Sequence, residues 1–287
     1  MSARDLPAIV GFVLLALLLA AALLAPWLAA DPETMNLAAI HAGPSLAHPL
    51  GTDELGRDVA ARLLHGGRVS LAVALTTAVL AALLGTAIGL VAGYRGGWLD
   101  ALLMRLTDGV MALPLLPLLI VLAALDPAKL GIGDEARASE IFMIGRMVVI
   151  IALVGWTGAA RLVRAQTLSV KTRDYVRAAT ALGAGPVRIM VRHILPNVAS
   201  PMVVAATLAV GNIILVESAL SFLGLGVQPP MASWGNMLTG ALDLIWSAPA
   251  LAVWPGAMIF VTVLCFNFLG DGLQDALDPR AGRSEGP

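Results

Sequence analysis

Two carboxylates stand in long apolar stretches of this chain, where they are the residues best placed for chemistry at membrane depth. Asp108 lies near one end of an apolar run, and Glu217 lies inside the run Ile-Ile-Leu-Val-Glu-Ser-Ala. An ionisable residue inside a membrane span is a functional candidate by default, for example as the proton site of an ion-coupled carrier. The alternative, which stays open at this point, is that each carboxylate pairs or caps within a helix bundle, Glu217 with a neighbouring subunit.

Three other kinds of chemistry lack the residues that they require. A phosphate-binding loop needs Gly-x-x-x-x-Gly-Lys, and neither Lys129 nor Lys171 follows a glycine, so this chain is not expected to hydrolyse ATP. Residues 131–134 match the Gly-x-Gly-Asp string of intramembrane aspartyl proteases, but Asp134 lies in a polar loop without a second carboxylate at membrane depth. The sequence has no His-Glu-x-x-His string, and no metal site is predicted.

The composition indicates which solvent surrounds these residues. Of the 287 residues, 59% are apolar and 13% are charged, and the mean hydropathy is +0.87. A soluble domain has about 45–50% apolar and about 25% charged residues, so lipid is the predicted solvent for much of this chain. The net charge of −1 excludes a nucleic-acid partner held by bulk charge, and the single Cys265 excludes a disulfide scaffold.

Six apolar stretches predict an all-α membrane protein with six transmembrane helices. Each stretch comes close to or exceeds the roughly 20 residues that a spanning helix needs. The first is longer than the apolar core of a signal peptide and precedes no clear cleavage site, so we expect it to be retained. The stretches cover residues 6–30, 69–94, 106–125, 141–160, 201–224 and 248–270.

The distribution of Lys and Arg predicts that both ends of the chain lie in the cytoplasm. In this orientation twelve Lys and Arg residues lie inside and six lie outside, and seven of the twelve fall within residues 161–192. Cytoplasmic loops carry the excess of positive charge. The loop between the fourth and fifth spans therefore fixes the predicted orientation.

That loop has the pattern of two short amphipathic helices joined by a Gly-Ala-Gly-Pro corner. Gly183 is expected to end the first helix, Pro186 to begin the second and Pro196 to end it. Helices this short are unstable alone in water, so the pair must dock on the inner membrane surface or in a groove of a partner protein. The predicted apolar stripes consist of Tyr175, Ala178, Ala179 and Leu182, and then of Val187, Met190, Val191 and Ile194.

The corner and its flanks resemble the EAA loop of binding-protein-dependent ABC importer permeases. The two alanines, the glycine and the Leu-Pro ending of that pattern are present, whereas Arg177 and His193 stand where the pattern has Glu and Ile. The resemblance implies that this loop fits a cleft of a cytoplasmic ATPase subunit and passes its motion to the membrane helices. The residues implied in this coupling are Tyr175, Arg177, Ala178, Ala179, Leu182, Gly183, Pro186, Leu195 and Pro196.

Further motifs resemble the second permease subunit of dipeptide, oligopeptide and nickel importers, over about residues 8–280. The residues of the first motif also predict a turn at 51–53 with helix-capping residues, followed by a short interfacial helix that leads into the second span. The stretch 126–140 is the part least like this family. The motifs lie at 48–71, 89–105, 217–238 and 266–280.

The resemblance implies the type I ABC importer permease fold in a bacterial inner membrane. The implied partners are a homologous permease subunit, two cytoplasmic ATPase subunits that bind ATP and Mg²⁺, and an extracytoplasmic binding protein; this chain would bind no cofactor. Peptides are the implied substrate, with nickel or another small solute as alternatives. We expect an N-terminal part (1–68), a permease core (69–270, coupling loop 171–196) and a tail (271–287). The pathway or gate candidates are Asp108, Glu217, Trp234 and Gly235.

Overall fold

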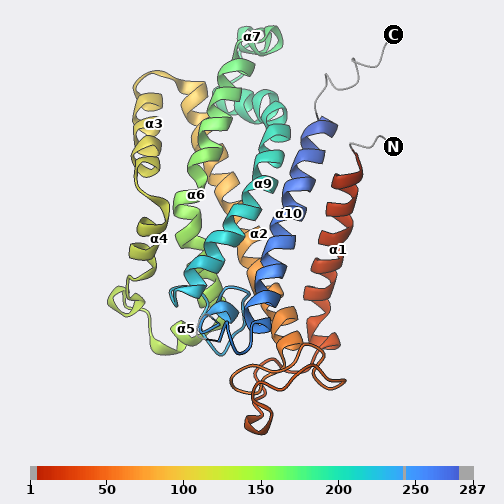
Figure 1. The fold of residues 1–287 in the computed structure, drawn as a ribbon. Helices are drawn as coiled ribbons and strands as arrows, with labels where there is room; N and C mark the ends of the chain where they lie inside the picture. The colour runs from red at the N-terminus through yellow and green to blue at the C-terminus, as the bar shows by residue number, and fades with distance from the viewer. Residues whose placement is uncertain (1–4, 242–243, 278–287) are drawn as a thin grey trace.

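The computed structural model describes residues 5–241 and 244–277 as a bundle of long helices (Figure 1). Five helices are long and apolar enough to cross a bilayer, and a bent pair of helices supplies a sixth crossing when it is counted as one span. The all-α prediction is confirmed, since the described residues contain no strand. The crossings are α1 (Asp5–Leu28), α2 (Val59–Arg95), α3 with α4 (Gly97–Ala112 and Leu115–Ala123), α6 (Glu140–Lys171), α9 (Leu195–Phe222) and α10 (Ala250–Leu277).

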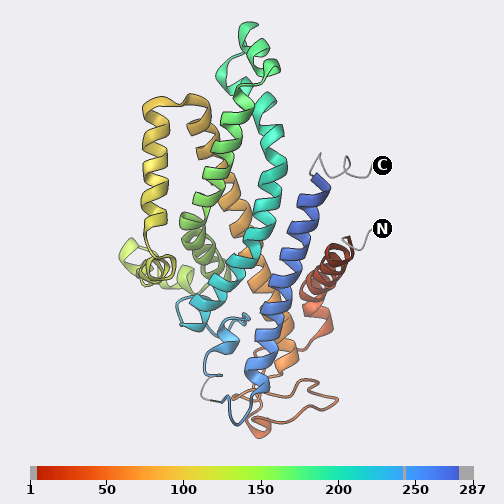
Figure 2. The same ribbon diagram turned by 45° about the horizontal axis from the view of Figure 1, so that its top comes forward.

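Figures 1 and 2 show how the crossings are arranged. Helices α1 and α10 lie side by side at one edge of the bundle, α3 and α4 lie at the opposite edge, and α2 lies behind α6 and α9. The start of α1, the end of α10 and the short helix α7 (Asp174–Ala181) share one end of the bundle. The loop after α1 and residues 223–241 and 244–249 share the other end, as six alternating crossings require. We call the first end inner and the second end outer, after the orientation that the charge distribution predicts. Arg4, Arg280 and Arg283, which entered the charge count, lie outside the described residues, as does most of the tail.

The third span is not one straight helix, which corrects the prediction over residues 106–125. Helices α3 and α4 meet at an angle of 90°. Leu113 has extended torsion angles (φ −82°, ψ 138°) because a proline disfavours the helical conformation of the residue before it. Pro114 caps α4, and Pro117 is tolerated because it lies in the first turn, where backbone N–H groups have no partner within the helix.

Pro196 does not end a helix, contrary to the prediction. Helix α8 (Pro186–Ile189), the π-helical turn η3 (Met190–Ile194) and α9 form one continuous helix of 37 residues. In the π turn the N–H of Leu195 donates to the carbonyl of Met190, five residues back. This wider turn lets the helix pass a proline that has no N–H to donate and would clash in a regular α-helix.

Helix α2 begins ten residues before the predicted second span, at Val59. The carboxylate of Asp58 caps it by accepting the Ala61 N–H at 2.8 Å. The helix then runs without a break to Arg95, so the prediction of a separate interfacial helix is wrong. The reason is that Gly66 and Gly67 pack directly on Ser233 and Trp234 of the outer connection, which extends the bundle beyond the apolar stretch.

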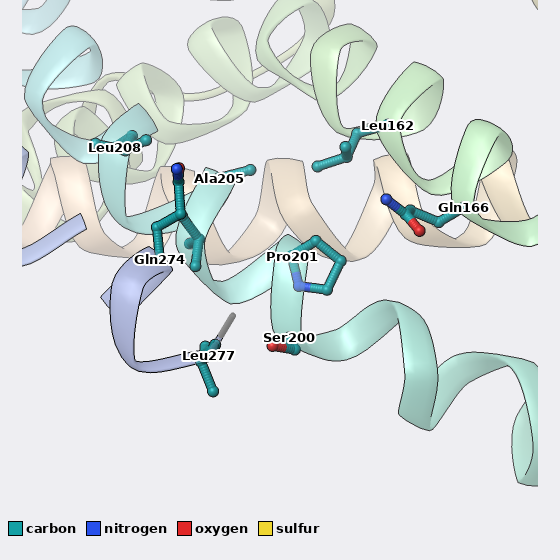
Figure 3. Close-up of a pocket in the computed structure, with 9 residues that line it drawn as sticks. Leu162, Gln166, Ser200, Pro201, Ala205, Leu208, Gln274 and Leu277 are labelled. Atoms are coloured by element: carbon teal, nitrogen blue, oxygen red, sulfur yellow. The ribbon is translucent and has the colours of Figure 1, made fainter. Parts of the chain in front are cut away.

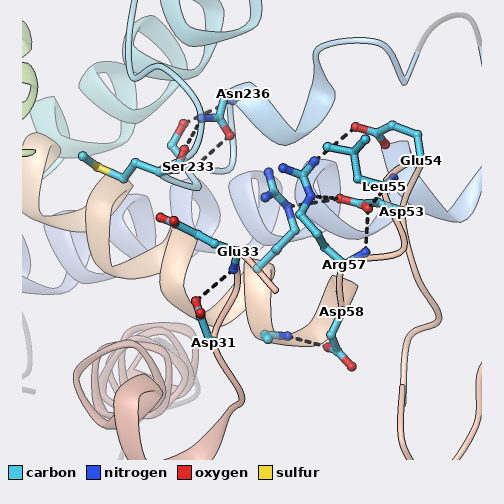
Figure 4. Close-up of polar contacts among 12 residues, drawn as sticks. Asp31, Glu33, Asp53, Glu54, Leu55, Arg57, Asp58, Ser233 and Asn236 are labelled. Carbon is cyan, nitrogen blue, oxygen red and sulfur yellow. Dashed lines mark hydrogen bonds and ion pairs between the residues drawn. The ribbon is translucent and has the colours of Figure 1, made fainter. Parts of the chain in front are cut away.

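The loop between α1 and α2 is folded around the buried carboxylate of Asp53 (Figure 4). One carboxylate oxygen accepts the backbone N–H groups of Leu55 and Arg57, and the other lies 2.7 Å from Arg57 Nε. The same carboxylate lies 3.4 Å from Arg62 Nε, on the first turns of α2. The tight turn runs from Asp53 to Gly56, two residues after the predicted one, where the Gly56 N–H donates to the Asp53 carbonyl.

The closest packing of the bundle joins α2 to α6. Gly85, Gly89 and Gly93 recur every fourth residue and therefore share one face of α2. A Cβ atom at Gly85 would lie 2.6 Å from the Trp156 carbonyl oxygen, and one at Gly93 would lie 2.8 Å from Thr167 Cβ. Small residues at this spacing allow helix backbones to touch in a membrane, where van der Waals packing drives helix association. This glycine face fixes the half of α6 that contains Trp156 to Thr167.

We expect Gly89→Leu to lower the midpoint of thermal unfolding of the purified chain in detergent. The added side chain would overlap α6, since a Cβ at this position already lies 2.9 Å from Val163 Cβ and from Arg164 N. Overpacking of a tight interface costs about 1–3 kcal/mol. Gly109→Leu on α3 is the matched control, because a Cβ there meets nothing within 4 Å. Equal midpoints for the two variants would contradict the close α2–α6 contact.

Candidate functional site

The corner between α7 and α8 is fixed by its own backbone. Gly183 has φ +83°, a left-handed conformation that glycine adopts without cost. Its N–H donates to the Thr180 carbonyl, and the Ala184 N–H donates to the Ala179 carbonyl, both at 3.0 Å. These two bonds form a Schellman motif, which ends α7 as predicted. Pro186 then begins α8 as its first residue, which confirms the other half of the predicted corner.

A small inner core anchors this corner to the membrane helices. Val176 of α7 and Ile189 of α8 are buried together against α6, α2 and the start of α9. The sequence pattern placed Tyr175, not Val176, on the stripe predicted to dock on the membrane surface or on a partner protein. The remaining residues of this core are Leu90, Val163, Val170, Ile194 and Val198.

The predicted stripes instead leave four large apolar side chains exposed. Leu182 is 89% exposed and Val187 is 70% exposed, and Tyr175 and Val191 are also exposed. We call these four residues the corner face. Of the elements that carry it, α7 lies beyond the ends of α6 and α9 (Figure 1). An apolar surface that projects past the bundle on a rigid turn is suited to docking in a groove of another protein.

The basic residues of the inner loop divide into two groups. Arg164 makes a bidentate pair with Asp100 of α3, with Nε–Oδ1 at 2.6 Å and Nη2–Oδ2 at 2.7 Å. Lys171 Nζ donates to the Tyr94 carbonyl at 2.8 Å and so fastens the end of α6 to α2. Both side chains thus stabilise the inner end of the bundle. The other five are exposed and form no ion pair within the described residues: Arg161, Arg173, Arg177, Arg188 and Arg192.

At the outer end of α9, Glu217 is fully buried and surrounded by serine hydroxyls. Its Oε1 accepts the Ser221 hydroxyl at 2.8 Å, and its Oε2 accepts the Ser70 hydroxyl at 3.1 Å. The Ser70 oxygen in turn accepts the Trp234 backbone N–H at 3.2 Å. One carboxyl group therefore joins α2, α9 and the outer connection. Within the described residues its hydrogen-bond partners are the hydroxyls of Ser70, Ser218 and Ser221, and none of the ion pairs there includes it.

Trp234 and Gly235 belong to the packed interior and do not form an open surface. The Trp234 side chain is 1% exposed, and its Nε1 donates to the Leu63 carbonyl at 3.0 Å. A Cβ at Gly235 would lie 2.6 Å from Ser218 Cα, so the connection approaches α9 as closely as backbone allows. Asn236 holds the turn by donating to the Met231 carbonyl at 2.7 Å and accepting the Ser233 N–H at 2.9 Å (Figure 4).

Asp108 is exposed on α3, away from the outer network. The structure therefore does not bring the two carboxylates of the spans into one site. A different polar feature is a groove between α6, α9 and α10, with cavities of about 530 and 320 Å³ that share Ala205 and Leu208. Figure 3 shows its inner part. The polar side chains that line the groove are Gln166, Ser200, Asn212 and Gln274.

Two of these features were missed from the sequence. The role of Ser70 is recognised only in the folded structure, where it contacts Glu217 of α9 and Trp234 of the outer connection. A single serine in a sequence does not indicate such a role. The groove depends on which face of each helix stays open. The described residues contain no group of three or more His, Cys, Asp or Glu side chains that could hold a metal ion.

We expect Glu217→Leu to lower the thermal midpoint more than Glu217→Gln does. The leucine leaves the buried hydroxyls of Ser70 and Ser221 without their acceptor, at a cost of about 1–3 kcal/mol each. The glutamine keeps the shape and one acceptor oxygen. Thermal unfolding and limited proteolysis of the 225–247 connection measure the effect, and a leucine variant as stable as the parent chain would refute it.

A family model and individual relatives of this chain point to the same protein family. Residues 85–283 match the family described as binding-protein-dependent transport system inner membrane component. A Brucella suis protein provisionally named a peptide permease is 44% identical over 96% of this chain and 87% of its own length. The glutathione transport system permease protein GsiD of Escherichia coli is 41% identical over 92% of this chain and 83% of its own length. The chain therefore belongs to the family of binding-protein-dependent transport system inner membrane components.

Proposed function

We propose that this chain is one of two homologous permease subunits of an ATP-driven importer that takes up peptides from an extracytoplasmic binding protein. Its family supplies the membrane permease component of ABC importers, which is not itself catalytic and works with ATPase and binding-protein partners. Two cytoplasmic ATPase subunits would bind ATP and Mg²⁺, one of them on this chain. The observation that carries the proposal is the exposed corner face on its buried anchor.

The corner face is better suited to a protein groove than to the inner membrane surface. Its apolar residues are exposed on α7, on the corner after it and on the first turns of the 37-residue helix, where exposed arginines are also found. The anchor of Val176 and Ile189 ties this face to α6 and to the 37-residue helix. Movement of an ATPase that grips the face would therefore tilt these helices and change which side of the membrane the pathway opens to.

The proposed orientation places both ends of the chain and the corner face in the cytoplasm. The start of α1, the end of α10 and α7 lie at the same end of the bundle. This end carries the exposed arginines of the inner loop, in agreement with the rule that cytoplasmic loops are rich in Lys and Arg.

The substrate pathway is proposed to run along the groove between α6, α9 and α10, where a second permease subunit would close it. Small side chains line its middle, and amides at Asn212, Gln166 and Gln274 offer donors and acceptors without fixed charge. Such a lining suits peptides of varied sequence. Glu217, Trp234 and Gly235 are proposed to support the outer gate from within the fold, and Asp108 to face the neighbouring subunit or the pathway.

Peptides are the proposed substrate class because relatives over most of this chain carry peptide or glutathione transport names. Glutathione is itself a tripeptide, so it falls within the same proposal. Nickel is disfavoured because the described residues offer no cluster of metal ligands. An ion-coupled carrier acting alone is disfavoured because Glu217 is enclosed by serines and Asp108 lies elsewhere.

Replacing Leu182 and Val187 together by aspartate should reduce copurification of the ATPase with this chain by about tenfold or more, because two charges would enter an apolar interface. ATP-dependent uptake should fall with it, while the chain remains inserted and folded. The control is Leu46→Asp, a fully exposed leucine of the outer loop. Undiminished association of the doubly substituted chain would reject the corner face as the ATPase site.

Labelling of introduced cysteines should locate the pathway, since Cys265 is the only native cysteine and is buried. We expect Asn212→Cys to react with a membrane-impermeant maleimide in the assembled transporter, with a rate that changes when ATP is added. Val203→Cys is the control, because it is also exposed but lies nine residues away, on the opposite face of α9. Reaction at 203 but not at 212 would place the pathway on the other face.

A further inference from the structure

Arg146 is a cation in an otherwise apolar part of α6, and the proposed transport mechanism does not use it. It lies six residues, or about 9 Å along the axis, from the outer end of this helix. Its Nη2 donates to the carbonyls of Ala123 and Leu125, the latter at 3.0 Å, at the end of α4. The C-terminal carbonyls of a helix carry only partial negative charge. None of the ion pairs within the described residues includes Arg146.

An apolar groove of about 480 Å³ opens directly beside this guanidinium. Its walls come from α4 and the outer half of α6, and Pro127 and Ile132 of the following loop cover its outer end. Arg146 is its single charged lining residue among those described. The other apolar lining residues are Leu122, Leu125, Ile141, Phe142, Val149, Ile150 and Leu153.

We propose that this groove binds one acyl chain of an acidic phospholipid from the outer leaflet, with the lipid phosphate on Arg146. The depth of Arg146 suits a headgroup, because α6 is 32 residues long and exceeds the hydrocarbon thickness of about 30 Å at its ends. Nε and Nη1 of Arg146 have no protein partner in the described part of the chain and can donate to a phosphate. A helix of a partner protein could fill the groove with apolar side chains, but it would also need an Asp or Glu side chain to pair with the Arg146 guanidinium.

A second cavity of about 220 Å³ adjoins the groove and also contacts Arg146. Arg137 and Gln228 line it together with apolar side chains such as Met143 and Met147, so this side of Arg146 offers polar groups that the apolar groove lacks. Arg137 is already paired with Asp134 and with Asp126, the latter at 3.6 Å, so the positive charge offered to a phosphate is that of Arg146. Arg146 thus lies between an apolar groove and a cavity with polar groups, as the boundary between the acyl chains and the headgroup of a phospholipid does.

The test is titration of the purified full-length chain in detergent with dioleoyl phosphatidylglycerol or dioleoyl phosphatidylcholine, followed by native mass spectrometry. We expect one tightly bound phosphatidylglycerol per chain and weaker binding of phosphatidylcholine. Arg146→Gln should weaken phosphatidylglycerol binding about tenfold, because it removes the positive charge beside the phosphate. Arg146→Lys should retain most of the binding, because it keeps that charge although it loses the hydrogen bonds of Nη2 to the two carbonyls.

A second variant fills the groove without touching the charge. Gly145 lines the groove, and a Cβ there meets nothing within 4 Å, so Gly145→Leu should displace the acyl chain while the fold is kept. Gly109→Leu on α3 is the matched control and should bind lipid as the parent chain does. Unchanged binding in both Arg146→Gln and Gly145→Leu would overturn the proposal. So would efficient cross-linking of Val149→Cys to another protein subunit in the assembled transporter, because the groove would then hold a protein.

Discussion

The close approach of α2 and α6 is the contact on which the rest of the structure depends. Three glycines of α2 let its backbone lie directly against backbone carbonyls and small or β-branched side chains of α6. In a bilayer the hydrophobic effect does not drive helices together, so close van der Waals packing has to hold them in contact. With α6 fixed in this way, its inner end carries the anchor of the corner face, and its outer end forms one wall of the apolar groove.

The two ends of the bundle are organised by different physical means. At the inner end an apolar core and a bidentate Arg164–Asp100 pair fix the helices, while apolar side chains are left exposed on a rigid turn. At the outer end a buried carboxyl and several hydroxyls join spans that are far apart in sequence. The inner end therefore exposes apolar side chains that a partner protein can contact, whereas the polar groups at the outer end bond to one another within this subunit.

The all-α architecture, the number of spans and the glycine corner could be predicted because each depends on local sequence. Apolar length predicts a span, and Gly183 followed by Pro186 predicts a corner, whatever the rest of the chain does. The bend at Pro114 was not predicted, although proline pairs are its usual cause. The continuation through Pro196 depends on a π turn that no residue type signals.

The site was predictable only in part for a related reason. Helical spacing correctly identified the apolar residues of the corner, but it could not say which of them face the chain itself and which face outward. That choice depends on a single contact, Val176 on the ends of α2 and α6. Similarly, the charge of Glu217 drew attention to it, but its role as a hydrogen-bond acceptor depends on Ser70, which lies 147 residues away in the sequence.

The unbroken helix from Pro186 to Phe222 acts as a lever arm. Its 37 residues extend about 55 Å, from the corner at one end of the bundle to the turns beyond the serine-enclosed carboxyl of Glu217 at the other. A rotation of about 5° around its middle would move each tip by roughly 2 Å, in opposite directions, which exceeds the tolerance of a hydrogen bond. A slight displacement at one face of the membrane would thus be enough to break or remake the bonds at the other face.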